Sequence, residues 1–91
     1  MKNLKNNPYG LKLYHIIKEK SYREGDFTLT SGKKSRYYID LKATTLHPEG
    51  AYCIGECIIK LIEENNIMCD AIGGLTLGAD PIATAVSVIG F

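Results

Sequence analysis

The fold is decided by the stretch Gly73-Gly74-Leu75-Thr76-Leu77-Gly78-Ala79-Asp80-Pro81, which directly follows the largely apolar run from Cys69 to Ile72. This order predicts a strand, a glycine-rich turn and then a helix, with Asp80 as the N-cap and Pro81 at the first helical position. Such a turn directs backbone N–H groups and the positive end of a helix dipole at one point. A phosphate or pyrophosphate group binds at points of this kind, and glycine lets the backbone approach it closely.

The glycine-rich turn does not match the best-known nucleotide fingerprints. Its glycines do not have G-x-G-x-x-G spacing, and no Gly-Lys-Ser/Thr follows. A tight strand-to-helix turn that binds nothing is therefore the alternative interpretation.

A second stretch, from Gly25 to Asp40, predicts a β-hairpin with a basic tip. Phe27 and Leu29 alternate with polar residues, and Tyr37 to Leu41 is typical of a second strand. The Ser-Gly-Lys-Lys-Ser-Arg turn between them offers cations and hydroxyl groups suited to a carboxylate or a phosphate. The neighbouring tyrosines offer flat surfaces for a planar ring. The alternative is an ordinary solvated turn.

These two stretches carry a resemblance to a known family. The run GDFTLTSGKKSRYYIDLKATTLHPEGA (25–51) resembles the N-terminal segment of orotate phosphoribosyltransferases, whose pattern there is close to F-x-L-x-S-G-x-x-S-x-Y-Y-x-D. The later DAIGGLTLGADPIATAV (70–86) resembles the family's first phosphate loop and the helix after it. The order and separation of the two stretches also match the family.

The resemblance implies an α/β fold, here the N-terminal part of a type I phosphoribosyltransferase fold: a parallel sheet core with helices on both faces, plus a small β-hairpin hood. Family members transfer phosphoribosyl from phosphoribosyl pyrophosphate to orotate, giving orotidine monophosphate and pyrophosphate. They use Mg²⁺ and form homodimers. The implied orotate-binding residues lie in the hairpin: Thr30, Ser31, Gly32, Lys33, Ser35, Tyr37 and Tyr38. The implied pyrophosphate loop is Thr76, Leu77, Gly78, Ala79 and Asp80, and the resemblance implies no catalytic side chain and no metal ligand in this segment.

The sequence departs from the family in its charges. Many members carry a lysine where this chain has Thr30, and some carry one in the phosphate loop, where Leu77, Gly78 and Ala79 stand here. This pattern suggests a subtype that relies on backbone amides and Thr76. A lysine-based role at those positions is not expected.

Two further family elements are absent from the 91 residues. One is an acidic pair followed by a Thr-Thr-Gly-like turn, which grips the ribose 5-phosphate, and the other is a mobile basic loop. We therefore expect one incomplete domain, with residues 1–47 as helix and hood and residues 48–91 as the start of the α/β core, and no transferase activity from this chain alone. The alternatives are a phosphoribosyltransferase for another base and a non-catalytic ligand-binding or regulatory module of the same fold.

Composition fits a small intracellular domain. The net charge of +1 argues against a large nucleic-acid footprint, and no apolar run reaches the roughly 18–20 residues that span a membrane. The stretch Met1–Pro8 lacks the apolar core of a signal peptide. Three cysteines form no pairing pattern and are expected as buried small side chains in a reducing compartment. We therefore expect a cytoplasmic protein whose partners are small-molecule substrates, without nucleic acid or membrane.

Periodicity predicts the remaining elements. A first helix should run from about Tyr9 to Lys20, a second from Pro48 to Glu64, and a third from Pro81 to Val88. Residues 44–47 are expected to form a connector, in which His47 is a surface or capping residue. Residues 67–75 are expected to form the parallel strand.

Overall fold

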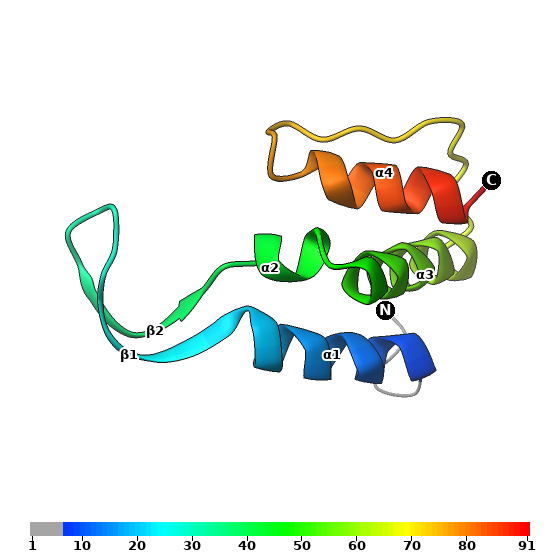
Figure 1. The fold of residues 1–91 in the computed structure, drawn as a ribbon. Coiled ribbons are helices and arrows are strands. Elements are labelled where there is room, and N and C mark those ends of the chain that lie inside the picture. The colour runs from blue at the N-terminus through cyan, green and yellow to red at the C-terminus, as the bar shows by residue number, and fades with distance from the viewer. Residues whose placement is uncertain (1–6) are drawn as a thin grey trace.

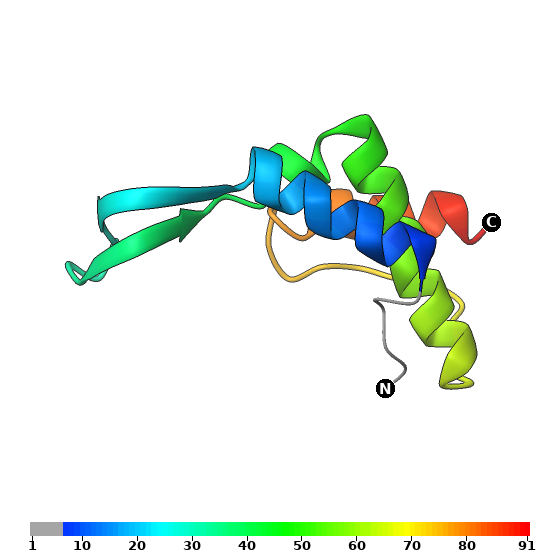
Figure 2. The same ribbon diagram turned by 90° about the horizontal axis from the view of Figure 1, so that it is seen from below.

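The computed structural model describes residues 7–91. Residues 1–6 lie outside the described residues, and they make up most of the stretch for which no signal peptide was predicted. The elements are α1 (Pro8–Lys20), β1 (Tyr22–Thr28), β2 (Lys34–Ile39), α2 (Lys42–Thr45), α3 (Pro48–Glu64) and α4 (Asp80–Ile89). In Figure 1, α3 lies between α1 and α4, and the β1–β2 hairpin projects away from the helices. Figure 2 shows the same projection from below.

The first helix begins and ends as its sequence predicts. The side chain of Asn7 accepts a hydrogen bond from the N–H of Tyr9 at 2.9 Å, and Pro8 follows the cap. At the other end the N–H of Ser21 donates to the carbonyl of Ile17 at 2.9 Å. Ile16 is the buried residue of this helix and turns toward the core.

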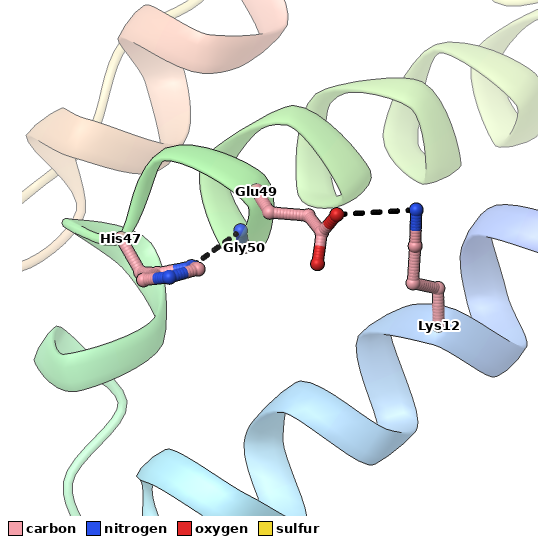
Figure 3. Close-up of polar contacts among 4 residues, drawn as sticks. All are labelled: Lys12, His47, Glu49 and Gly50. Carbon is pink, nitrogen blue, oxygen red and sulfur yellow. Dashed lines mark hydrogen bonds and ion pairs between the residues drawn. The ribbon is translucent and has the colours of Figure 1, made fainter.

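The start of α3 confirms His47 as a capping residue. Its Nδ1 accepts a hydrogen bond from the N–H of Gly50 at 3.2 Å, which requires the tautomer without a proton on Nδ1 (Figure 3). Beside this cap, Lys12 of α1 donates to the carboxylate of Glu49 at 3.1 Å. That hydrogen bond is the main cause of the raised pKa of Lys12. Both side chains are about half exposed, so the pair orients α1 against α3 more than it stabilises the fold.

Two glycines set how closely α3 approaches its neighbours. A Cβ at Gly50 would collide with the carbonyl oxygen of Thr44, and a Cβ at Gly55 would lie 2.9 Å from the carbonyl oxygen of Ala85 and 2.8 Å from Cγ1 of Ile89. The backbone of α3 therefore packs directly on α2 at one position and on α4 at another. A side chain at either glycine would force these helices apart.

We expect Gly55→Val to lower the free energy of unfolding of the chain by about 2 kcal/mol or more, because overpacking against backbone atoms cannot relax by a rotamer change. Chemical denaturation followed by circular dichroism measures this change. Gly73→Val is the matched control, since a Cβ at Gly73 meets nothing within 4 Å. Equal midpoints for the two variants would contradict this account of the α3–α4 contact.

The root of the hairpin is tied to the helical body by buried polar groups. Ser21 and Thr44 are 1% and 0% exposed, and their hydroxyl oxygens lie 2.6 Å apart in a hydrogen bond. The N–H of Asp40 donates to the carbonyl of Ser21 at 3.0 Å. Thr44 belongs to α2, a helical turn in a region for which the sequence predicted only a connector. This turn exists because Thr44 and Thr45 are buried against the neighbouring helices.

The expected parallel strand over residues 67–75 is wrong for this chain, because the structure has irregular, exposed backbone there. The described residues form one two-stranded antiparallel sheet, so no neighbouring strand is present to receive this segment. Asp80 is also not the N-cap of α4: it is the first helical residue, Ala79 precedes it, and no side-chain cap bond forms. Its carboxylate still lies at the positive end of the helix dipole.

The cysteines divide into two classes. Cys53 and Cys57 on α3 are buried, as expected, and burial raises the pKa of both thiols. Cys69 was also expected to be buried, but it is exposed because the strand that would have covered it does not form. Its thiol donates to the carbonyl of Ala71 at 3.3 Å.

Candidate substrate-binding site

The hairpin has two aromatic faces. In its antiparallel register, Arg23 pairs with Tyr38 and Glu24 pairs with Tyr37, and side chains alternate between faces along each strand. Tyr37 stacks on Tyr22 with ring centroids 6.1 Å apart. Partial burial is the main cause of the raised pKa of Tyr22, followed by Glu24, to which its hydroxyl donates. The Tyr37 ring on this face therefore contacts Tyr22 within the hairpin, and it stays 54% exposed.

The opposite face of the hairpin is hollow. Phe27 and Tyr38 lie with ring centroids 5.7 Å apart and tilted by 32°. They form part of a pocket of about 740 Å³, which we call the hairpin pocket. Its lining residues are Arg23, Phe27, Thr28, Leu29, Thr30, Ser31, Tyr38 and Asp40.

The structure thus brings together three of the seven hairpin residues expected from the sequence: Thr30, Ser31 and Tyr38. The others do not line this pocket. Ser35 exchanges hydrogen bonds with Tyr37, donating to its carbonyl at 2.8 Å and accepting from its N–H at 3.2 Å. Gly32 forms the tip with a φ of +86°, and the N–H of Lys33 donates to Ser31 at 3.4 Å.

The predicted phosphate loop is a turn that leads into α4. The N–H of Ala79 donates to the carbonyl of Thr76 at 3.0 Å, and the N–H of Asp80 donates to that of Leu77 at 3.3 Å. In the part of the chain that the structure describes, the N–H groups of Leu77 and Gly78 have no protein acceptor. They are therefore available to an anion.

The glycines of this region have different roles. A Cβ at Gly74 would collide with Ala79, so Gly74 is needed for the turn itself. A Cβ at Gly78 would meet only Oγ1 of Thr76, at 3.8 Å, and its backbone has no positive φ. Packing does not require glycine at position 78. A ligand that approaches the backbone closely would require it, because any side chain would stand in the way.

A second pocket, of about 520 Å³, lies where this turn meets α2, and we call it the loop pocket. Two residues of the phosphate loop, Leu77 and Gly78, line it. The other expected loop residues do not, and Asp80 instead borders a groove between α3 and α4. The remaining lining residues are Asp40, Leu41, Lys42, Thr45, Leu46, Pro81 and Ile82.

Asp40 lines both pockets and joins them into one surface. One carboxylate oxygen accepts a hydrogen bond from the N–H of Lys42 at 3.2 Å, so the residue is held at the end of β2. The two sequence stretches that suggested a function, which are separated by more than thirty residues, therefore meet on either side of one side chain.

Sequence reasoning did not find two basic residues of this surface. Arg23 and Lys42 were not among the predicted site residues, yet Arg23 lines the hairpin pocket and Lys42 lines the loop pocket. The strand register could have identified Arg23, because Arg23 pairs directly with Tyr38, which was a predicted site residue. No comparable local signal exists for Lys42, whose position depends on how α2 packs.

Residues 7–91 hold no group of three or more His, Cys, Asp or Glu side chains that could bind a metal ion. In the same range every helix is too short or too polar to cross a membrane.

The sequence is similar to those of known orotate phosphoribosyltransferases. The chain is 50% identical over 78 residues to an orotate phosphoribosyltransferase of Nostoc sp. and 52% identical over 81 residues to one of Aquifex aeolicus, with 86% of this chain aligned in each case. It spans only 36% and 43% of the length of these relatives. A scan against models of protein families matched none.

Solved structures give the same result for the fold. The orotate phosphoribosyltransferase of Mycobacterium tuberculosis superposes with a TM-score of 0.80 at 38% identity in its complex with Fe(III) dicitrate, covering 87% of this chain and 46% of that one. Its complex with inorganic phosphate gives a TM-score of 0.79. The predicted resemblance is therefore confirmed, and the helices and hairpin correspond to the N-terminal part of a type I phosphoribosyltransferase fold.

Proposed function

We propose that this chain, whose sequence and fold match the N-terminal part of orotate phosphoribosyltransferases, forms the base- and diphosphate-binding part of such an enzyme. The reaction transfers phosphoribosyl from phosphoribosyl pyrophosphate to orotate, giving orotidine monophosphate and pyrophosphate for pyrimidine biosynthesis. The observation that carries the proposal is the pair of pockets joined at Asp40. One of them belongs to the hairpin, and the other contains the free N–H groups of the phosphate loop.

In this proposal the hairpin pocket receives orotate. Phe27 and Tyr38 offer apolar ring surfaces to a planar pyrimidine, while Thr30 and Ser31 offer hydroxyl groups to its polar edge. Arg23 supplies a cation that suits the carboxylate of orotate. Gly32, Lys33, Ser35 and Tyr37 remain proposed members of the base-binding segment in a supporting role, since they shape the tip and the outer face of the hairpin without lining the pocket.

The loop pocket receives the diphosphate of the donor. Departure of pyrophosphate leaves an oxocarbenium-like ribose, so catalysis rests on positioning and on stabilising the leaving negative charge. Backbone N–H groups at Leu77 and Gly78, together with the N-terminal end of α4, are suited to that task. No side-chain nucleophile is required. Thr76, Ala79 and Asp80 complete the proposed loop by holding its turn.

The donor set of the loop pocket fits Mg²⁺ that is bound together with the substrate. This ion favours oxygen ligands and commonly keeps waters and phosphate oxygens with only one or two carboxylates. Asp40 is the carboxylate residue that lines the pocket and would hold the ion, although the sequence predicted no metal ligand in this segment. When bound, Mg²⁺ supplies charge neutralisation for the diphosphate.

The assembly and location of the protein also belong to the proposal. We propose that residues 1–47 and 48–91 act as the hood and the start of the core within one phosphoribosyltransferase domain, and that the enzyme is a homodimer whose partners are its small-molecule substrates. A cytoplasmic location is supported by the buried free thiols of Cys53 and Cys57, which suit a reducing compartment.

We expect Tyr38→Ala, in the full-length enzyme, to raise the KM for orotate about tenfold, because a stacking surface for one base contributes about 1–3 kcal/mol. The KM for phosphoribosyl pyrophosphate should change much less. Steady-state kinetics with each substrate varied in turn measures both values.

Tyr37→Ala is the matched control, since Tyr37 stacks on Tyr22 on the other face of the hairpin. It should leave the KM for orotate within about twofold, well below the 1–3 kcal/mol of a stacking contact. Equal effects of the two variants, or a larger effect of Tyr38→Ala on the donor, would refute the assignment of orotate to the hairpin pocket.

A further inference from the structure

The phosphate loop itself carries no positive charge. Leu77, Gly78 and Ala79 stand where a lysine could neutralise the diphosphate, and Asp40 adds a negative charge to the same pocket. Backbone N–H groups supply only partial charges. Mg²⁺ bound with the substrate would neutralise part of the charge of a diphosphate, and a cation from another element of the fold would neutralise more of it.

The structure offers that cation on α2. Lys42 lines the loop pocket together with Leu77 and Gly78, although more than thirty residues separate them in sequence. Its backbone is fixed by the hydrogen bond from its N–H to Asp40. Within residues 7–91 its ammonium group forms no ion pair, whereas Lys12 does.

A second polar group of α2 lines the same pocket. Thr45 is 4% exposed, and its hydroxyl oxygen is buried without a hydrogen-bond partner among the described residues. An unpaired buried hydroxyl is destabilising, so a water or a ligand that pairs with it would be favourable. Lys42 and Thr45 belong to α2, whereas Leu77 and Gly78 belong to the phosphate loop, so two separate segments of the chain line the pocket.

We propose that Lys42 and Thr45 form a second wall of the diphosphate site, with the Lys42 ammonium supplying the cation that the phosphate loop lacks and the Thr45 hydroxyl donating to a phosphate oxygen. The inference rests on the proposed function, because it requires a diphosphate in the loop pocket. Lys42 offsets the charge of Asp40, so that a polyanion can enter beside a carboxylate. The diphosphate is then held from two sides, by α2 and by the N-terminal end of α4.

The test is the affinity of the full-length enzyme for inorganic pyrophosphate, measured by isothermal titration calorimetry at low salt. We expect Lys42→Gln to weaken binding about tenfold, as for loss of a charged hydrogen bond. This difference should shrink as sodium chloride screens the charge. Lys42→Arg should bind within about threefold of the wild type, because it keeps the charge.

Lys60→Gln is the control for loss of one positive charge, since Lys60 is exposed on α3 and lines none of the pockets described above. Thr45→Val tests the hydroxyl separately: we expect weaker pyrophosphate binding, by about threefold, with an unchanged or raised melting temperature, because a buried unpaired group has been removed. Weaker binding with a lowered melting temperature would assign Thr45 a purely structural role and overturn its part of the proposal.

The outcomes separate this inference from the proposed function. In one outcome the wild type binds pyrophosphate, Gly78→Val weakens binding and Lys42→Gln leaves it unchanged. That outcome would overturn the role of Lys42 and Thr45 but would leave the assignment of the phosphate loop intact. If the wild type does not bind pyrophosphate at all, the proposed function fails and the second wall falls with it. Equal losses of pyrophosphate affinity in Lys42→Gln and Lys60→Gln would mean that only the net charge of the protein matters, and would overturn the role of Lys42.

Discussion

A polypeptide confined to these 91 residues is expected to show no orotate-dependent release of pyrophosphate above background. The family resemblance implies a ribose-phosphate turn and a mobile basic loop, neither of which this sequence contains. Removing one group that stabilises the transition state costs about two to three powers of ten in rate, so the loss of both elements costs about four to six. A typical enzyme turns over about 10 times per second, so the remaining rate would be about 10⁻³ to 10⁻⁵ per second, close to the assay background.

The orotate phosphoribosyltransferase of Aquifex aeolicus, assayed at the same concentration of sites, is the control for the 91-residue polypeptide. Circular dichroism of the polypeptide should still show the helices, so that inactivity is not mistaken for unfolding. The exposed apolar segment that includes Met68 and Leu75, which are 96% and 99% exposed, should also drive self-association in sedimentation experiments. Turnover near ordinary enzyme rates, or a strictly monomeric polypeptide, would show that the missing elements matter less than we infer.

Gly78→Val in the full-length enzyme is expected to lower kcat/KM for phosphoribosyl pyrophosphate by about 10²–10³-fold, because a branched side chain would block the approach of the diphosphate to the backbone N–H groups. The fold should be unaffected, since the nearest neighbour of a Cβ at this position is Oγ1 of Thr76 at 3.8 Å. Kinetics with the donor varied, together with thermal melting, measures both quantities.

Gly73→Val serves as the control for the loop variant, because it adds the same side chain in open space just before the turn. It should keep most of the activity. Unchanged donor kinetics in Gly78→Val, at an unchanged melting temperature, would mean that the loop does not approach the diphosphate through its backbone.

The long helices and the hairpin could be predicted because their signals are local. Pro8, Pro48 and Pro81 mark the helix starts, and the apolar period between them gives the length of each helix. The hairpin followed from two apolar runs around a Ser-Gly turn. Its first strand begins earlier than expected, because an irregularity between Glu24 and Phe27 interrupts the alternation that was used to find it.

The features that were missed depend on contacts between distant residues. The α2 turn contains Thr44 and Thr45, which have modest helix propensity, and it is held by burial against α3. Residues 67–75 have the composition of a buried parallel strand, but a strand also needs hydrogen-bonded neighbours, which these residues do not have here. Lys42 reaches the loop pocket only through this packing, so its place could not be predicted from sequence spacing.

The hydrogen bonds at the root of the hairpin hold one end of it, so a rotation of the hairpin about this root would displace the tip most. Ser21 is bound to Thr44 and to Asp40, so both strands are anchored at one end while the tip stands clear of the helices. The seven residues of β1, at about 3.3 Å each, give an arm of about 23 Å, so that a rotation of about 5° at the root moves the tip by about 2 Å. Asp40 lies at the root of the hairpin and would hardly move in such a rotation. Small angular changes would therefore adjust the far rim of the hairpin pocket while its shared border with the loop pocket stays fixed.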